Sequence, residues 1–167
     1  MEQTVASIAL PVDEALTIKK MRIEPKTEDG KCKRISVVTG IHGDELEGQY
    51  VCFELIRRIR ENESALKGIV DIYPAMNPLG IDSITRGIPA FDLDMNRLFP
   101  GDSEGNMTEY LASEIIRDVS GSDVVFDIHA SNIFIKRIQI LHDKFSTAHK
   151  SKARTAFITE FILNLIQ

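Results

Sequence analysis

The stretch from Arg34 to Gly48 reads RISVVTGIHGDELEG and decides the fold class. Its first part, residues 34–40, is a short β-branched run that ends in glycine, which is typical of a buried strand. The chain then enters residues 45–60, where apolar side chains recur at helical spacing with charged side chains between them. A buried strand followed directly by an amphipathic helix predicts the beginning of a strand–helix–strand unit.

The same alternation continues further along the chain. Residues 69–74 and 123–128 are strand-like apolar runs, and residues 108–119 have the periodicity of a second amphipathic helix. A long irregular segment, residues 79–105, lies between them, and long loops in compact domains usually carry function. The alternation predicts an α/β fold with a mixed, largely parallel sheet that is covered by helices on both faces.

The composition is that of an ordinary globular domain. The chain has 167 residues, of which 43% are hydrophobic and 27% charged, and this length is sufficient for one core. A net charge of −5 argues against a nucleic-acid-binding surface. No apolar run approaches the ~20 residues that span a membrane, and the N-terminus lacks the features of a secretory signal. We therefore expect a cytoplasmic protein without nucleic-acid or membrane partners.

The charge balance changes near residue 136. Residues 1–135 carry 14 basic and 23 acidic side chains, whereas residues 136–167 carry six basic and two acidic ones. The second segment contains no Gly or Pro and ends in AFITEFILNLIQ, residues 156–167, which has helical periodicity. We therefore predict a main domain over residues 1–135, followed by a divergent basic linker and an apolar helix over residues 136–167.

Candidate metal ligands lie at the carboxyl ends of the predicted strands, which is where open α/β sheets bind ligands. His42 and Glu45 follow the first of these strands, and His129 follows the last. Because these strand ends meet at one edge of the sheet, two imidazoles and a carboxylate come together there. Zinc takes such nitrogen and oxygen ligands, and three protein ligands leave a fourth position open for water. We predict one zinc ion per chain, bound by these three residues.

Each of these residues also has an ordinary interpretation. A surface histidine that precedes a carboxylate at a helix start produces the His-x-x-Glu spacing of His42 and Glu45 without any metal. His129 on its own is also typical of a core histidine that is hydrogen-bonded to the backbone. The placement of all three residues at strand ends favours the metal site.

The long irregular segment adds polar side chains to this edge. Arg97 carries a planar guanidinium that suits a carboxylate, and Asn96 adds both a donor and an acceptor. Arg86, earlier in the segment, is able to polarise a carbonyl. The alternative is a solvated loop in which Arg97 forms an ion pair with Asp92 or Asp94.

Four spaced motifs resemble the succinylglutamate desuccinylase/aspartoacylase family, a branch of the zinc carboxypeptidase-like hydrolases: IHGDELEG, Asn77-Pro78, FDLDMNRLFPG and VFDIHAS. The resemblance covers about residues 34–135. It implies a three-layer α/β/α fold and one zinc ion held by His42, Glu45 and His129. It also implies a deacylase that hydrolyses the amide bond of a small N-acyl amino acid or related carboxylate.

The resemblance also assigns roles to the polar residues of the long segment. It implies that Asn96 and Arg97 bind the carboxylate of the substrate, and that Arg86 polarises the scissile carbonyl. The family's general base is a glutamate on a later strand, and we identify no matching segment in this chain. We therefore expect a fold that is incomplete at its C-terminus and that exposes an unpaired sheet edge, which favours marginal stability or a homo-oligomer.

Three functional hypotheses follow. The first is a zinc-dependent amide hydrolase, which the family resemblance implies. The second is a catalytically inactive, truncated zinc-binding remnant of that family, which the missing general base favours. The third is a structural domain that binds no metal, and it requires three residues to coincide at strand ends by accident.

Overall fold

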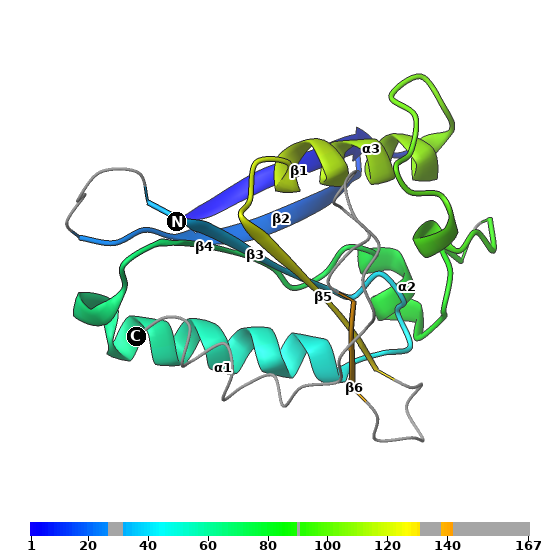
Figure 1. The fold of residues 1–167 in the computed structure, drawn as a ribbon. Coiled ribbons are helices and arrows are strands. Elements are labelled where there is room, and N and C mark those ends of the chain that lie inside the picture. Colours follow the sequence, from blue (N-terminus) through cyan, green and yellow to red (C-terminus); the bar gives the residue numbers. More distant parts are fainter. Residues whose placement is uncertain (27–31, 90, 131–137, 142–167) are drawn as a thin grey trace.

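A six-stranded sheet organises the chain, and the strands lie side by side in the order β1-β2-β4-β3-β5-β6 (Figure 1). The computed structural model describes residues 1–26, 32–89, 91–130 and 138–141. The strands are β1 (Glu2–Ala9), β2 (Ala15–Ile23), β3 (Arg34–Thr39), β4 (Ile69–Tyr73), β5 (Val124–Ala130) and β6 (Ile138–Leu141).

The sheet is mixed, with parallel strands only at its centre. Strand β3 pairs in parallel with β4 on one side and with β5 on the other. Strands β1, β2 and β6 pair antiparallel with their neighbours, so the expected parallel arrangement holds for three strands and not for most of the sheet. The difference arises because β1 and β2 form a hairpin, which needs only a short turn where parallel strands need a crossover helix. Val12 and Asp13 make this turn with φ values of 66° and 59°.

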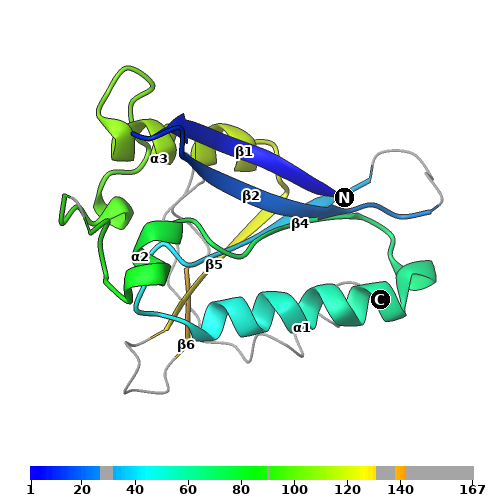
Figure 2. The same ribbon diagram turned by 180° about the vertical axis from the view of Figure 1, so that it is seen from behind.

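Helices cover both faces of the sheet, which confirms the predicted three-layer α/β/α architecture (Figures 1 and 2). Helix α1 (Glu47–Glu61) packs an apolar stripe of Cys52, Leu55 and Ile59 against the face that carries Val37, Ile72, Phe126 and Ile128. Helix α3 (Met107–Val119) lies on the opposite face and contributes Leu111, Ala112, Ile115 and Val119 to a second core.

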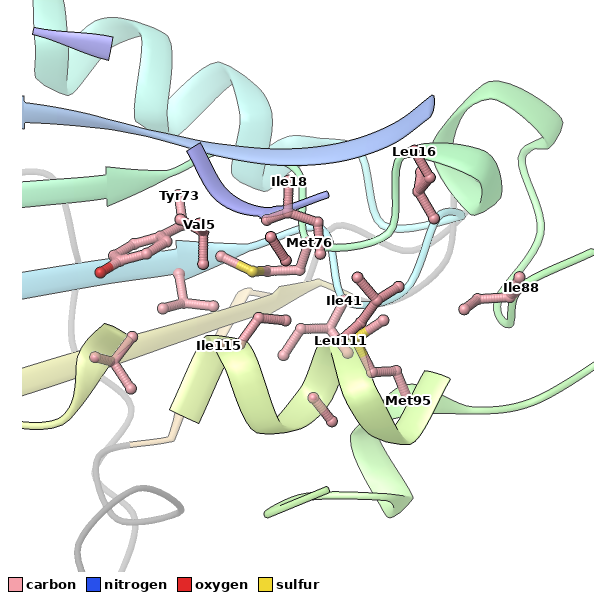
Figure 3. Close-up of a cluster of buried hydrophobic side chains, with 14 residues drawn as sticks. Val5, Leu16, Ile18, Ile41, Tyr73, Met76, Ile88, Met95, Leu111 and Ile115 are labelled. Carbon is pink, nitrogen blue, oxygen red and sulfur yellow. The ribbon is translucent and has the colours of Figure 1, made fainter. Parts of the chain in front are cut away.

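The second core also immobilises the long segment between β4 and α3 (Figure 3). This segment contains the short helix α2 (Pro78–Ser83) and the 3₁₀ turn η2 (Met95–Arg97). Its side chains Met76, Ile88 and Met95 are at most 1% exposed. Burial of each such side chain stabilises the fold by about 1.5–3 kcal/mol. The segment is therefore anchored at several points and is not a free loop.

The boundaries of two elements differ from the sequence prediction in ways that affect the site. Helix α1 begins at Glu47, so Glu45 lies in the loop that precedes the helix and not in its first turn. Strand β5 continues to Ala130, so His129 lies within the strand and not after it. Both residues are therefore held by backbone that is anchored to the sheet.

Strand β6 lies within residues 136–167, which we predicted to be a linker and a helix. Residues 138–141 instead belong to the sheet, because they pair with the edge of β5 that would otherwise expose unpaired backbone groups. The helix predicted over residues 156–167 lies outside the described residues. Among the helices that the structure describes, none has the length and apolar character needed to cross a membrane.

A network of charged side chains ties the N-terminal hairpin to the sheet. Asp71 on β4 is fully buried and accepts hydrogen bonds from Arg22 Nε at 2.7 Å and from Arg34 Nε at 2.8 Å. Lys20 Nζ lies 3.4 Å from Asp71 and 2.7 Å from Asp118 on α3. These hydrogen-bonded pairs allow a polar strand such as β2 to lie inside the sheet.

Candidate metal site

Three predicted ligands converge at the carboxyl end of the central strands. His42 Nδ1 lies 2.8 Å from Glu45 Oε1, and His129 Nδ1 lies 3.0 Å from Glu45 Oε2 and 3.2 Å from His42 Nδ1. All three side chains are buried. Within the described residues, they form the only group of His, Cys, Asp and Glu side chains that is close enough to share a metal ion.

The separations of these atoms fit a zinc ion. Tetrahedral zinc with bonds of about 2.0–2.1 Å to nitrogen and oxygen places its ligand atoms about 3.3 Å apart. The observed separations of 2.8 to 3.2 Å require only small movements to reach that geometry. Three protein ligands leave a fourth coordination position open, as in catalytic zinc sites.

Close backbone contacts fix the loop that carries two of these ligands. A Cβ atom added at Gly43 would overlap the backbone carbonyl group of Gly80, and the Gly43 N–H donates to the carbonyl of Thr85 at 3.0 Å. A Cβ atom added at Gly48 would overlap the side chain of Thr39, at the end of β3. The loop before α1 is thus held between α2 and the sheet.

Each ligand histidine also contacts a carboxylate through its other ring nitrogen. Asp94 Oδ1 lies 3.1 Å from His42 Nε2, and Asp127 Oδ2 lies 3.1 Å from His129 Nε2. Such carboxylates hold the proton on Nε2, so that Nδ1 is free to bind a metal. Sequence reasoning assigned neither aspartate. The two-residue spacing of Asp127 and His129 on one face of a strand is a signal that could have identified the first.

Hydrogen bonds within the ligand set shift the pKa values of two of its members. Burial raises the pKa of Glu45, but hydrogen bonds from His129 and His42 outweigh it and lower the pKa to about 2. Burial lowers the pKa of His129, but its hydrogen bonds to Asp127 and Glu45 raise the pKa to about 9. A metal ion and a proton would therefore compete for Nδ1 of His129.

The two arginines of the long segment lie beside the ligands. Arg86 is within 3.6 Å of Glu45 Oε1 and 3.4 Å of Asp94 Oδ2, and Arg97 Nε is 3.4 Å from the same Asp94 oxygen. The backbone N–H of Asn96 donates to Asp94 Oδ1 at 3.0 Å. Arg97 therefore does pair with Asp94, as the solvated-loop interpretation expected, but Asp94 itself contacts His42. The pair thus belongs to the site.

The chain is similar to known proteins of one family. The family model of the succinylglutamate desuccinylase/aspartoacylase catalytic domain matches residues 31–166. The expectation that the resemblance ends near residue 135 is therefore wrong, because the match continues through the basic segment.

This chain spans less than half of the length of each of the relatives described here. The N-alpha-acetyl-L-2,4-diaminobutyric acid deacetylase of Halomonas elongata is 39% identical over 92 residues, which is 54% of this chain and 26% of that protein. The solved structure of a succinylglutamate desuccinylase/aspartoacylase from Rhodobacter sphaeroides has a TM-score of 0.67 and 28% identity. An aspartoacylase family protein of Mesorhizobium loti has a TM-score of 0.65 and 28% identity. Each alignment covers 78% of this chain and 40% of the solved one.

Proposed function

Because the chain belongs to the succinylglutamate desuccinylase/aspartoacylase family, we propose that it is a zinc-dependent hydrolase of amide bonds. Its substrate would be a small N-acyl amino acid or a related carboxylate, which it would deacylate. The observation that carries this proposal is the convergence of His42, Glu45 and His129, with Arg86 beside them.

The proposed roles follow from the positions of the side chains. Zinc in this site would lower the pKa of a water molecule and polarise the carbonyl of the scissile amide. Arg86, within reach of Glu45, would stabilise the negative charge that develops on that carbonyl oxygen. Arg97 and Asn96 both contact Asp94, Arg97 at Oδ2 and the Asn96 backbone N–H at Oδ1, and beside it they would bind the substrate's carboxylate. A general base is not identified among the described residues.

A metal-binding domain without turnover is the second candidate. It is favoured by one observation: Glu45, Asp94 and Asp127 each contact a ligand histidine, so none of the three is a separate carboxylate that could serve as general base. The cytoplasmic location, the homo-oligomer and the division at residue 135 stay predictions.

The first test is the zinc content per chain. We expect about one zinc in the wild-type protein and its loss in His42→Ala, Glu45→Gln and His129→Ala. Glu61→Gln is the matched control, because Glu61 lies at the far end of α1 and pairs with Arg57, and this variant should keep its zinc. A folded wild-type protein that binds no zinc would refute the proposal.

Turnover then separates the two candidates. Release of free amine from N-acetyl amino acids by the zinc-loaded protein, abolished by a chelator and restored by zinc, would support the hydrolase. One bound zinc without any release of amine would support the metal-binding domain.

A further inference from the structure

The two aspartates that contact the ligand histidines lie in different surroundings. Asp127 is fully buried, and its Oδ1 atom has no hydrogen-bond partner among the described residues. Among the described residues, no Lys or Arg lies within ion-pair distance of Asp127, and its only such partner is His129. Asp94 is 18% exposed, and its Oδ2 atom is shared by Arg86 and Arg97.

This difference affects how strongly each aspartate acts on its histidine. Two guanidinium groups lie 3.4 Å from Asp94 Oδ2 and partly offset its charge, so His42 faces a weaker field than an unpaired carboxylate would exert. Asp127 has no such compensation and lies in the low-dielectric interior, where a hydrogen bond to a charged acceptor is stronger. A stronger acceptor at Nε2 makes Nδ1 of the same imidazole a better metal ligand.

We infer that the two aspartates have separate tasks in this site. Asp127 is a positioning residue that sets the metal affinity through His129, whereas Asp94 mainly holds Arg86 in place for the scissile carbonyl and Arg97 in place for the carboxylate of the substrate. This inference rests on the proposed function, since it concerns the same zinc ion and the same substrate group.

The substitutions Asp127→Asn and Asp94→Asn form a matched pair, because each removes one charge and keeps the size of the side chain. Asp127→Asn should weaken zinc binding by about 10–100-fold, the usual effect of removing such a partner. It should leave the affinity of the zinc-loaded protein for acetate or N-acetylglycine unchanged. Asp94→Asn should weaken zinc binding less than Asp127→Asn does. It should also weaken the binding of acetate and of N-acetylglycine, because it releases Arg97, the residue proposed to bind their carboxylates.

The measurement is competition between the full-length protein and a chromophoric chelator for zinc, with far-UV circular dichroism to select folded variants. A second readout is independent of affinity: in the zinc-loaded wild type the Nε2 proton of His129 should give a protected, downfield NMR signal. That signal should be lost in Asp127→Asn and kept in Asp94→Asn. A structural role alone would not produce this difference.

The failures are distinguishable. If the wild type binds zinc and Asp127→Asn binds it equally well with its Nε2 signal intact, the inference is wrong and the proposed function stands. If Asp94→Asn loses more zinc affinity than Asp127→Asn, the inference is also wrong. A wild-type protein that binds no zinc would overturn both.

Discussion

The substitution Gly43→Ala should separate the geometry of the metal site from its ligands. The added Cβ atom would overlap the backbone of Gly80 and Ile81, and backbone atoms cannot rotate away as a side chain does. The loop that carries His42 and Glu45 must then move by about 1 Å to restore normal contact in a close-packed interior. Metal ligands tolerate displacements of only about 0.5 Å, so zinc affinity should fall at least tenfold.

The cost in stability can be worked from the same contacts. Overpacking of a tight site costs about 1–3 kcal/mol. Weakening the hydrogen bond from Gly43 to Thr85 costs about 1 kcal/mol more. Alanine also lowers the conformational entropy of the unfolded chain, which offsets about 0.4–1 kcal/mol of this loss. We therefore expect the metal-free variant to lose about 2 kcal/mol of unfolding free energy, measured by urea denaturation in the presence of a chelator.

Gly121→Ala is the matched control. Gly121 has a φ of +90° and no atom within 4 Å of an added Cβ, so alanine there strains the backbone without crowding a neighbour. The left-handed conformation costs about 1–2 kcal/mol for an alanine. Both variants should therefore lose similar stability, but only Gly43→Ala should lose zinc affinity. Wild-type zinc affinity in Gly43→Ala would refute the idea that this backbone contact positions the ligands.

Three further changes test other parts of the structure. Asp71→Asn leaves Arg22 and Arg34 without their buried partner, and it should cost about 3 kcal/mol in urea unfolding; a loss below 1 kcal/mol would contradict the role of the network. Asn106→Ala removes the side chain that caps α3 and should cost about 1 kcal/mol by thermal unfolding, whereas an unchanged Tm would show that the cap is dispensable. The raised pKa of His129, about 9 against 6.5, means that its charge stabilises the metal-free fold fully below pH 6.5. That stabilisation should be lost as the pH rises through 9. In the presence of a chelator, the free energy of unfolding measured with urea should therefore be lower at pH 10 than at pH 6 in the wild type, and this difference should be absent in His129→Ala.

The central part of the fold could be predicted because its apolar pattern is simple. The strand at residues 34–39 buries Val37 and Val38 and is followed by an amphipathic helix. Such a strand–helix unit has few stable arrangements. The N-terminal hairpin could not be predicted in the same way. Strand β2 contains Lys20 and Arg22, which indicate a solvated segment until their distant partner, Asp71, is known. Contacts between residues about 50 positions apart are not visible in a local pattern.

The same difference between local patterns and long-range contacts explains which residues of the site could be predicted from the sequence. His42, Glu45 and His129 could be predicted because each lies at or near the end of a strand, and connectivity alone brings these ends together. Asp94 could not be predicted, because its contact with His42 depends on how the long segment folds back over 52 positions of sequence. The position of that segment is set by buried residues such as Met95, which carry no chemical signal.

Small residues, and not the ligands themselves, bring the three ligands of the site together. Two histidines and a glutamate have no intrinsic tendency to meet, because burying them together costs solvation free energy. They are held together by contacts that only glycine permits, from Gly43 to the backbone of α2 and from Gly48 to Thr39. The backbone N–H of Ala130 also fixes Glu45 by donating to its carboxylate at 2.9 Å. Because these contacts order the loop, the binding free energy of a metal ion would not be spent on ordering it and would add to the stability of the fold.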